Sequence, residues 1–332
     1  MRAGLSPPFF MPNLTRADRI PGPVLSLLDR FEAAYRLQFQ DGTVPGRAYF
    51  RASGAKRLRP LLFFLAQGLV GEPEVESLPW AVLIELIHTA SLIHDDVVDG
   101  ADLRRGRHSY SAQQGRRMSV LVGDHIVARA LSIGVDQNRP KALRIVSHTV
   151  LSMTRGELIQ NAMIRSKSMA LDSYYRVIRE KTASLFSATC ELAGLLQGAR
   201  PVQRERLKRL GNAFGMAYQI RDDILDFTGD PGRLGKPTGL DLRNGQRTLP
   251  FLLAVQGAAS KEKQAVRDKL NAFSPASAEW ISRFVRERNG IGLAIAEANR
   301  LIDKAHGTCS LFPPSACRTA MDNLLLRHRQ RK

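Results

Sequence analysis

One segment, LPWAVLIELIHTASLIHDDVVD (78–99), limits most strongly what this chain can fold into. Its apolar residues occupy most faces of a helix, and such a helix is stable in water only when other elements surround it. Elsewhere, apolar residues recur at three- and four-residue spacing, which is typical of amphipathic helices, and no segment shows strand-like alternation with hairpin turns. We therefore predict an all-α bundle. The other helices are expected at 24–39, 117–134, 139–164, 171–197, 203–227, 247–256, 260–273, 277–287, 291–304 and 314–328.

The length of 332 residues and the 44% hydrophobic content permit one large core or two domains. We expect a flexible, proline-containing tail at 1–23 and a single domain at 24–332. No early segment reads as a signal peptide, and no stretch approaches roughly 18 uninterrupted apolar residues, so no membrane span is expected. The three cysteines have no metal-like spacing, which fits free thiols in the cytoplasm.

The chain is strongly basic, with 49 Lys and Arg against 31 Asp and Glu and a net charge of +18. Such a balance suggests an anionic partner, which would be nucleic acid, an acidic membrane surface or a phosphorylated substrate. A solvated basic surface is the alternative interpretation. No helix-turn-helix, zinc or aromatic-basic pattern supports nucleic acid, so we expect no nucleic-acid partner.

Two aspartate clusters interrupt this basic chain with the same D-D-x-x-D spacing: Asp95, Asp96 and Asp99, and Asp222, Asp223 and Asp226. Residues four apart share one face of a helix. A single cluster is most often a solvated helix face, but two identical clusters in apolar helices favour two carboxylate rims across a cavity. Carboxylates at this density suit Mg2+, which keeps waters and shares itself with substrate phosphates.

Basic residues near these clusters would hold phosphate groups. Each one alone is more often a surface charge, and His88, two turns before Asp95, is alone more often a core histidine. Together they indicate a phosphate-binding site, because arginine binds two phosphate oxygens at once and lysine acts as a point charge. The set contains Lys56, Arg57, Arg59, His88, Arg104, Arg105, Lys181 and Lys236, with Thr182 beside them.

From about residue 25 to 328 the chain resembles the trans-type polyprenyl diphosphate synthases, which elongate isoprenyl chains. The motifs that carry the resemblance are GAKRLRP, HTASLIHDDVVDGADLRRG, VLVGDHIVARA, GELIQ, EKTASLFSATCELAG, AYQIRDDILDFTGD and LGKPTGLDLRNGQRTLP. The resemblance implies the isoprenoid synthase fold, a single-domain all-α bundle around a deep central cavity, and usually a homodimer. It implies that an allylic diphosphate ionises, that isopentenyl diphosphate attacks, and that a proton is lost.

The resemblance also implies a role for each matching residue. Asp95 and Asp99 would bind two Mg2+ ions and Asp222 a third, with Asp96, Asp223 and Asp226 in support. Isopentenyl diphosphate would be held by Lys56, Arg59, His88 and Arg105. The allylic diphosphate would be held by Arg104, Lys181, Gln219 and Lys236, with Thr182 near the developing cation. The residues expected to be catalytic are Asp95, Asp99, Lys181 and Asp222.

Two positions depart from the family pattern. Ala55 stands where the family often has the second glycine of Gly-Gly-Lys, and a positive φ there would cost energy. Gln246 stands where the family often has lysine before x-Thr-Leu-Pro, which removes one charge from the allylic diphosphate site. Whether the adjacent Arg247 compensates is open at this point.

Small residues before the first aspartate cluster favour a long product. Short-chain family members typically put an aromatic ring where this chain has Ala90 and Ser91, and the facing helix offers Leu131. Since each helical turn adds about 5.4 Å of depth, we predict a product of around C35 to C50. Alternatives are a C15–C20 product, with another bulky residue closing the cavity, or a class I terpene cyclase, whose second metal motif typically differs. The basic tail RHRQRK leaves open a peripheral membrane contact for product release.

Overall fold

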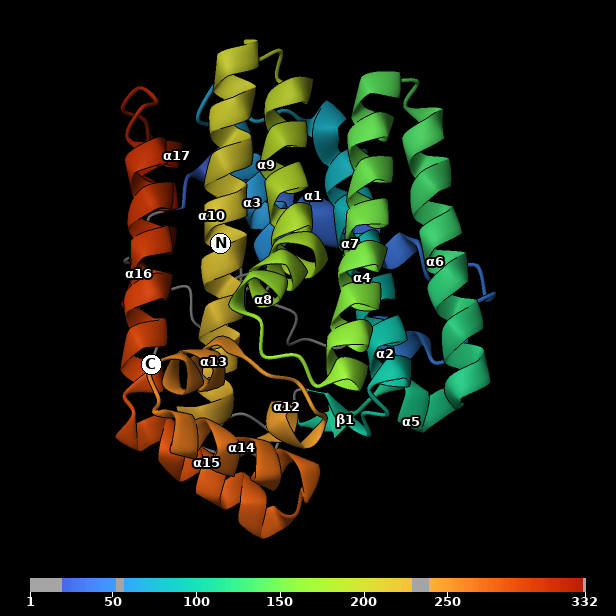
Figure 1. The fold of residues 1–332 in the computed structure, drawn as a ribbon. Coiled ribbons are helices and arrows are strands. Elements are labelled where there is room, and N and C mark those ends of the chain that lie inside the picture. Colours follow the sequence, from blue (N-terminus) through green and yellow to red (C-terminus); the bar gives the residue numbers. More distant parts are fainter. Residues whose placement is uncertain (1–19, 52–56, 105, 229–238, 331–332) are drawn as a thin grey trace, which may run out of the picture.

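The computed structural model describes residues 20–51, 57–104, 106–228 and 239–330, and shows a bundle of long, roughly antiparallel helices (Figure 1). The first half of the chain forms α1 (Gly22–Leu37), α2 (Arg47–Arg51), α3 (Leu58–Gln67), the short 3-10 helix η2 (Val75–Ser77), α4 (Leu78–Val98), β1 (Leu103–Arg104), β2 (Arg107–His108), α5 (Tyr110–Gln114), α6 (Arg116–Asp136) and α7 (Pro140–Ser166).

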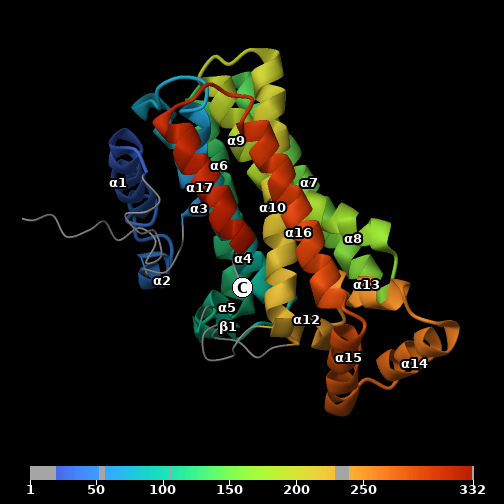
Figure 2. The same ribbon diagram turned by 90° about the vertical axis from the view of Figure 1, so that its left-hand side faces the viewer.

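The second half of the chain continues the same helical bundle. It forms α8 (Leu171–Val177), the π-helical segment η3 (Ile178–Ala183), α9 (Ser184–Leu196), α10 (Pro201–Thr228), α12 (Leu240–Arg243), α13 (Leu249–Gln256), α14 (Ser260–Asn271), α15 (Pro275–Glu287), α16 (Gly290–Cys309) and α17 (Ala316–Gln330). A quarter turn of the view shows α14 and α15 extending from one end of the bundle (Figure 2). The fold is therefore the predicted all-α bundle.

Helix α4 lies inside the bundle, as its apolar sequence predicts. Trp80, Leu83 and Leu86 are almost fully buried, and α4 packs against α1, α3 and α6. The burial of one such side chain is worth about 1.5–3 kcal/mol, so packing of its apolar part holds the helix in place. Its last turn carries the first aspartate cluster, which is thereby fixed to the core.

The segment predicted as one helix at 171–197 is divided by η3, whose residues Ile178–Ala183 form a π-helical turn. A π turn inside an α-helix inserts one residue and frequently marks a functional site. Gly156 on α7 allows the close approach, because a Cβ atom there would lie 2.5 Å from the backbone nitrogen of Lys181. The close approach therefore places Lys181 against α7, while the next residue, Thr182, bonds to Gln219 on α10.

Some boundaries and small elements differ from the sequence predictions. Helix α1 begins at Gly22, two residues inside the predicted tail, and residues 1–19 lie outside the described ranges. Leu103 pairs with His108 in a short antiparallel ladder that we did not predict, because two residues per strand are too few to show alternation. The ladder places Arg104 next to the first aspartate cluster.

Helix α6 alone, among the described helices, has the length and hydropathy of a membrane span. Its apolar window has a mean hydropathy of 1.4, and 33% of that window is buried. Four of its exposed side chains, Val120, Leu121, Leu131 and Val135, fall within about 100° of one another on the helix. These four residues form a stripe on the outer face of α6, but exposed Arg117 and Asp124 lie within the same arc, so the stripe is only partly apolar. Length and composition alone do not assign it to a membrane.

Candidate active site

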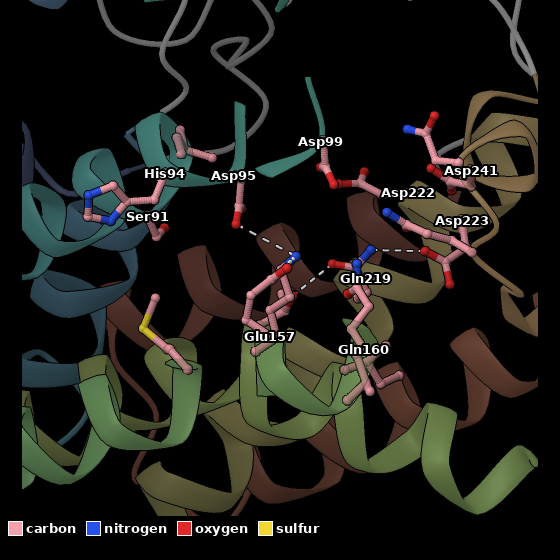
Figure 3. A pocket seen from close by; sticks show the side chains of 18 of the residues that line it. Ser91, His94, Asp95, Asp99, Glu157, Gln160, Gln219, Asp222, Asp223 and Asp241 are labelled. Carbon is pink, nitrogen blue, oxygen red and sulfur yellow. Dashed lines mark hydrogen bonds and ion pairs between the residues drawn. The ribbon is translucent and has the colours of Figure 1, made fainter. Parts of the chain in front are cut away.

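A cavity of about 890 Å³ lies between the helices that carry the two aspartate clusters. Its walls come from α3, α4, α6, α7, α8, η3 and α10, from the β1 strand and from residues 240–248. Carboxylates and cations gather at one part of this cavity (Figure 3), while Ile87, Val127, Val150 and Met153 supply apolar wall elsewhere. The arrangement combines a charged rim with an apolar interior.

The first aspartate cluster faces this cavity from the end of α4. Burial raises the pKa of Asp95 to about 6, even though the Lys181 ammonium acts in the opposite direction. Burial also raises the pKa of Asp99, again against Lys181. Asp96 is 1% exposed and accepts two hydrogen bonds from Arg104 Nε, at 2.7 and 2.9 Å. Asp95 and Asp99 are thus the members of this cluster that remain available to a cation.

Lys181 lies between two carboxylates, Asp95 and Glu157. Its Nζ atom is 3.6 Å from Asp95 Oδ1 and forms a shorter ion pair with Glu157. Burial opposes the charged form, but the two carboxylates outweigh it and raise the pKa of Lys181. Lys181 is therefore a fixed cation within reach of the first cluster.

Glu157 is a cavity residue that we did not predict. It belongs to the motif GELIQ, one residue after the glycine that admits η3, and Gln160 of the same motif also lines the cavity (Figure 3). The available signal was the glycine of this motif inside a predicted helix, since glycine permits a close approach of another backbone.

In the second cluster, on α10, Asp222 and Asp223 line the cavity and Asp226 does not. Asp223 is 3% exposed and accepts hydrogen bonds from Tyr174 Oη (2.6 Å) and Gln219 Nε2 (2.9 Å). Burial raises the pKa of Asp223 to about 7, although these donors lower it. Asp222 is therefore the member of this cluster best placed for a metal.

Asp226 does not reach the cavity, and its predicted supporting role at the metal site stays a prediction. It is fully buried and is absent from the cavity wall. Its two carboxylate oxygens accept hydrogen bonds from the backbone nitrogens of Leu240 and Asp241, each at 3.2 Å. Asp226 thus fixes the first turn of α12, where a carboxylate also suits the helix dipole.

Thr182 and Gln219 form a hydrogen-bonded chain across the cavity wall. Thr182 Oγ1 donates to Gln219 Oε1 at 2.8 Å, and Gln219 Nε2 donates in turn to Asp223 Oδ1 at 2.9 Å (Figure 3). Because both ends of the Gln219 amide are engaged, its orientation is fixed. The wall between η3 and α10 is therefore pre-organised.

The predicted isopentenyl diphosphate residues fall partly within the described ranges. Arg59 and His88 line the cavity, and the Arg59 guanidinium lies over the ring of Phe186, 4.4 Å from its centroid. Three predicted phosphate-binding residues, Lys56, Arg105 and Lys236, lie outside the described residues. Arg57, between Lys56 and Arg59, instead forms a buried ion pair with Glu85 at 3.0 Å.

The structure separates the three residues predicted to control product length. Ser91 lines the cavity, whereas Ala90 is fully buried in the core and is not part of the wall. Leu131 also stays outside the cavity, with 37% of its surface exposed, because it belongs to the outer stripe of α6. Val127, one turn earlier on α6, lines the cavity in its place.

The residues present fit divalent cations that are shared with a ligand. Among the described residues, no group of three potential ligand side chains converges on one point. Asp95, Asp99 and Asp222 instead line one cavity, and Asp99 contributes to the raised pKa of Asp95. Mutually repelling carboxylates of this kind suit Mg2+ that completes its coordination with phosphate oxygens.

Residues 46–286 match the family model described as polyprenyl synthetase. The chain belongs to this family. It is 34% identical over 273 residues to the all-trans-nonaprenyl-diphosphate synthase (geranyl-diphosphate specific) of Rhodobacter capsulatus, covering 82% of this chain and 84% of that protein. It is 39% identical over 219 residues to the octaprenyl diphosphate synthase of Escherichia coli, covering 66% and 68%.

Solved structures of polyprenyl synthases share the fold. The decaprenyl diphosphate synthase of Rhodobacter capsulatus superimposes with a TM-score of 0.86 at 31% identity, covering 93% of this chain and 97% of that one. The polyprenyl synthase of Caulobacter crescentus, complexed with calcium and isoprenyl diphosphate, gives a TM-score of 0.83 at 31% identity, with 93% and 98% coverage. The predicted family and the predicted isoprenoid synthase fold are therefore confirmed.

Proposed function

We propose that this protein condenses isopentenyl diphosphate with an allylic diphosphate, in a Mg2+-dependent reaction, to make an all-trans polyprenyl diphosphate. The observation that carries the proposal is the single cavity that joins two aspartate clusters, fixed cations and an apolar interior. The named activities of the long-chain relatives support the same reaction. The short-chain alternative is supported by geranylgeranyl pyrophosphate synthase structures of 28% and 29% identity, which is less than the 34% and 39% identity to the long-chain relatives. No terpene cyclase is among these relatives.

Asp95, Asp99 and Asp222 would hold Mg2+, with three ions in each site as the expected number. When bound, Mg2+ stabilises the negative charge that develops on the departing diphosphate. Lys181 and Arg104 add fixed positive charge at the same rim, and ion pairs with carboxylates already orient both side chains. Charge fixed before the reaction costs no reorganisation in the transition state.

The two substrates bind at different parts of the cavity. Arg59 and His88, with Lys56 and Arg105, would hold isopentenyl diphosphate. Arg104, Lys181 and Gln219, with Lys236, would hold the allylic diphosphate. Thr182, whose hydroxyl is fixed by Gln219, lies near the cation that forms when the diphosphate departs. The departed diphosphate is the expected proton acceptor.

The apolar wall keeps water away from the allylic cation and accommodates the growing chain. Ile87, Val127, Val150 and Met153 contribute to it, and no aromatic ring stands at Ser91, one turn before Asp95. At about 5.4 Å for each helical turn, an open passage here fits a product of about C35 to C50, with C40 as the central value.

A homodimer is the proposed assembly, with the partly apolar outer stripe of α6 as the contact between two copies. The stripe exposes Val120, Leu121, Leu131 and Val135 beside the charged Arg117 and Asp124. Sedimentation at twice the mass of one chain would support the dimer. We further propose a cytoplasmic enzyme that touches a membrane only at its periphery, when the product leaves.

A two-component enzyme is the second candidate. The chain is 36% identical over 82% of its length to heptaprenyl diphosphate synthase component 2 of Geobacillus stearothermophilus. The experiment that separates the candidates uses the purified chain alone with radiolabelled isopentenyl diphosphate, an allylic primer and Mg2+. Turnover by the chain alone supports the single-component enzyme, and turnover only after addition of a second protein supports the alternative.

A further inference from the structure

Arg247 is a buried cation on the cavity wall for which the described residues offer no partner. Its side chain lines the cavity, although the residue is only 9% exposed. Its Nε atom is buried without a hydrogen bond, and no described carboxylate forms an ion pair with it. Arg104 and Lys181 on the same wall are each paired with carboxylates. Arg247 therefore differs in kind from these neighbouring cations.

The backbone around Arg247 fixes its position beside the second aspartate cluster. Gly245 turns the chain with a φ of +76°, and the Gln246 nitrogen donates to the Asp241 carbonyl at 2.8 Å. Two residues after Arg247, the Leu249 backbone N–H donates to Asp223. Arg247 thus lies in a segment whose neighbouring residues are hydrogen-bonded to Asp223 and Asp226 of the second cluster, and it lines the same cavity as Asp222.

An unpaired guanidinium in such a place lowers the stability of the empty protein. Taking a charge out of water without a partner is costly, and burial lowers the pKa of Arg247. An anion that enters the cavity would supply the missing partner. A diphosphate suits the guanidinium because two parallel N–H groups can bind two phosphate oxygens at once.

We propose that Arg247 binds the allylic diphosphate, in the role that the family often gives to a lysine at position 246. In this chain the positive charge has moved one residue along the segment, and neutral Gln246 occupies the former place. The inference rests on the proposed function for the identity of the ligand. The segments on either side of Arg247 are hydrogen-bonded to Asp223 and Asp226 of the second cluster, whereas Arg59 and His88 lie on α3 and α4, which favours the allylic diphosphate over isopentenyl diphosphate.

The test compares R247M with the double variant Q246K/R247M, which restores a cation at the position usual for the family. Steady-state kinetics with geranyl diphosphate should show a KM for this primer that rises by about 10-fold to 100-fold in R247M, the range for losing a charged hydrogen bond. The KM for isopentenyl diphosphate should stay within about twofold of wild type, since only one site is changed. The double variant should recover most of the loss.

Binding of inorganic pyrophosphate in the presence of Mg2+, measured by calorimetry, gives a readout that does not need turnover. R247M should weaken it, and Q246K/R247M should restore it. The matched control is R243M, because Arg243 is exposed on α12 and is absent from the cavity wall. R243M should match wild type in both measurements. R247Q replaces R247M if the latter does not fold.

Thermal melting without ligand separates binding from a structural role. Removing an unpaired buried charge should leave the melting temperature of the empty protein unchanged or raise it, whereas loss of a structural contact would lower it. An unchanged geranyl diphosphate KM and pyrophosphate affinity in R247M would overturn the proposal, and so would an equal rise in both substrate KM values. If wild type shows no condensation at all, the proposed function fails, and pyrophosphate binding still decides the role of Arg247.

Discussion

Substituting Ser91 with phenylalanine should shorten the product from about C35–C50 to about C15–C20. Ser91 lines the cavity and precedes Asp95 by four residues, which corresponds to about 6 Å along the helix. A five-carbon unit of an extended prenyl chain has about the same length. A ring at position 91 would therefore narrow the passage near the metal rim, so that chains of more than about four five-carbon units no longer fit.

The substitution should leave the fold largely intact. Ser91 Oγ donates to the His88 carbonyl at 2.9 Å, and loss of such a hydrogen bond costs about 1 kcal/mol. The ring enters open cavity, so it does not overpack the core. By contrast, Ala90 is fully buried and off the cavity wall, so A90F should lower the free energy of unfolding by about 1–3 kcal/mol.

Mass analysis of products from isopentenyl diphosphate and an allylic primer measures the effect. S91A is the matched control, because it removes the same hydrogen bond and leaves the cavity open; its product should equal that of wild type. An S91F enzyme that still makes the wild-type product would refute the assignment of Ser91 to the passage. A shortened product from S91A would refute the steric reasoning.

Three other predictions concern the charged rim. D95A and D222A should each reduce turnover by about 100-fold or more while the metal-free melting temperature holds or rises, because each removes a carboxylate proposed as a metal ligand; near-normal activity in both would exclude the metal assignment. R59A and H88A should raise the KM for isopentenyl diphosphate more than the KM for the primer, and an equal rise would show that the two sites are wrongly divided. Without Mg2+, stability should fall as the pH rises from about 4 to about 7, because burial raises the pKa of Asp223 from 3.8 to about 7 and the folded state holds this proton more tightly. D223N should flatten that pH dependence of the melting temperature, and an unchanged slope would assign it to other groups.

The helices and the cluster on α4 were predictable because their causes are local. The apolar content of 78–99 requires a buried helix, and the spacing of Asp95 and Asp99 places both on one side of its end. The structure adds that both side chains line the cavity. Local sequence patterns therefore sufficed where a helix alone determines the direction of the side chain.

The surroundings of Asp226 could not be predicted from local sequence patterns. It has the same place in its motif as Asp99, but its surroundings come from α12, a segment that follows later in the chain and donates two backbone hydrogen bonds to it. Lys181 likewise depends on a π-helical turn that fits against Gly156 of another helix. These features arise from contacts between segments, and motif spacing does not contain that information.

Mass spectrometry of the products made by the purified chain, with and without Mg2+, tests the central claim most directly. The reaction would contain isopentenyl diphosphate and geranyl diphosphate, and a parallel sample would contain a chelator. We expect a linear polyprenyl diphosphate series that ends at about C35 to C50 with Mg2+, and no product with the chelator. Cyclised hydrocarbons, products that stop at C15 to C20, or equal turnover in the chelator would contradict the account.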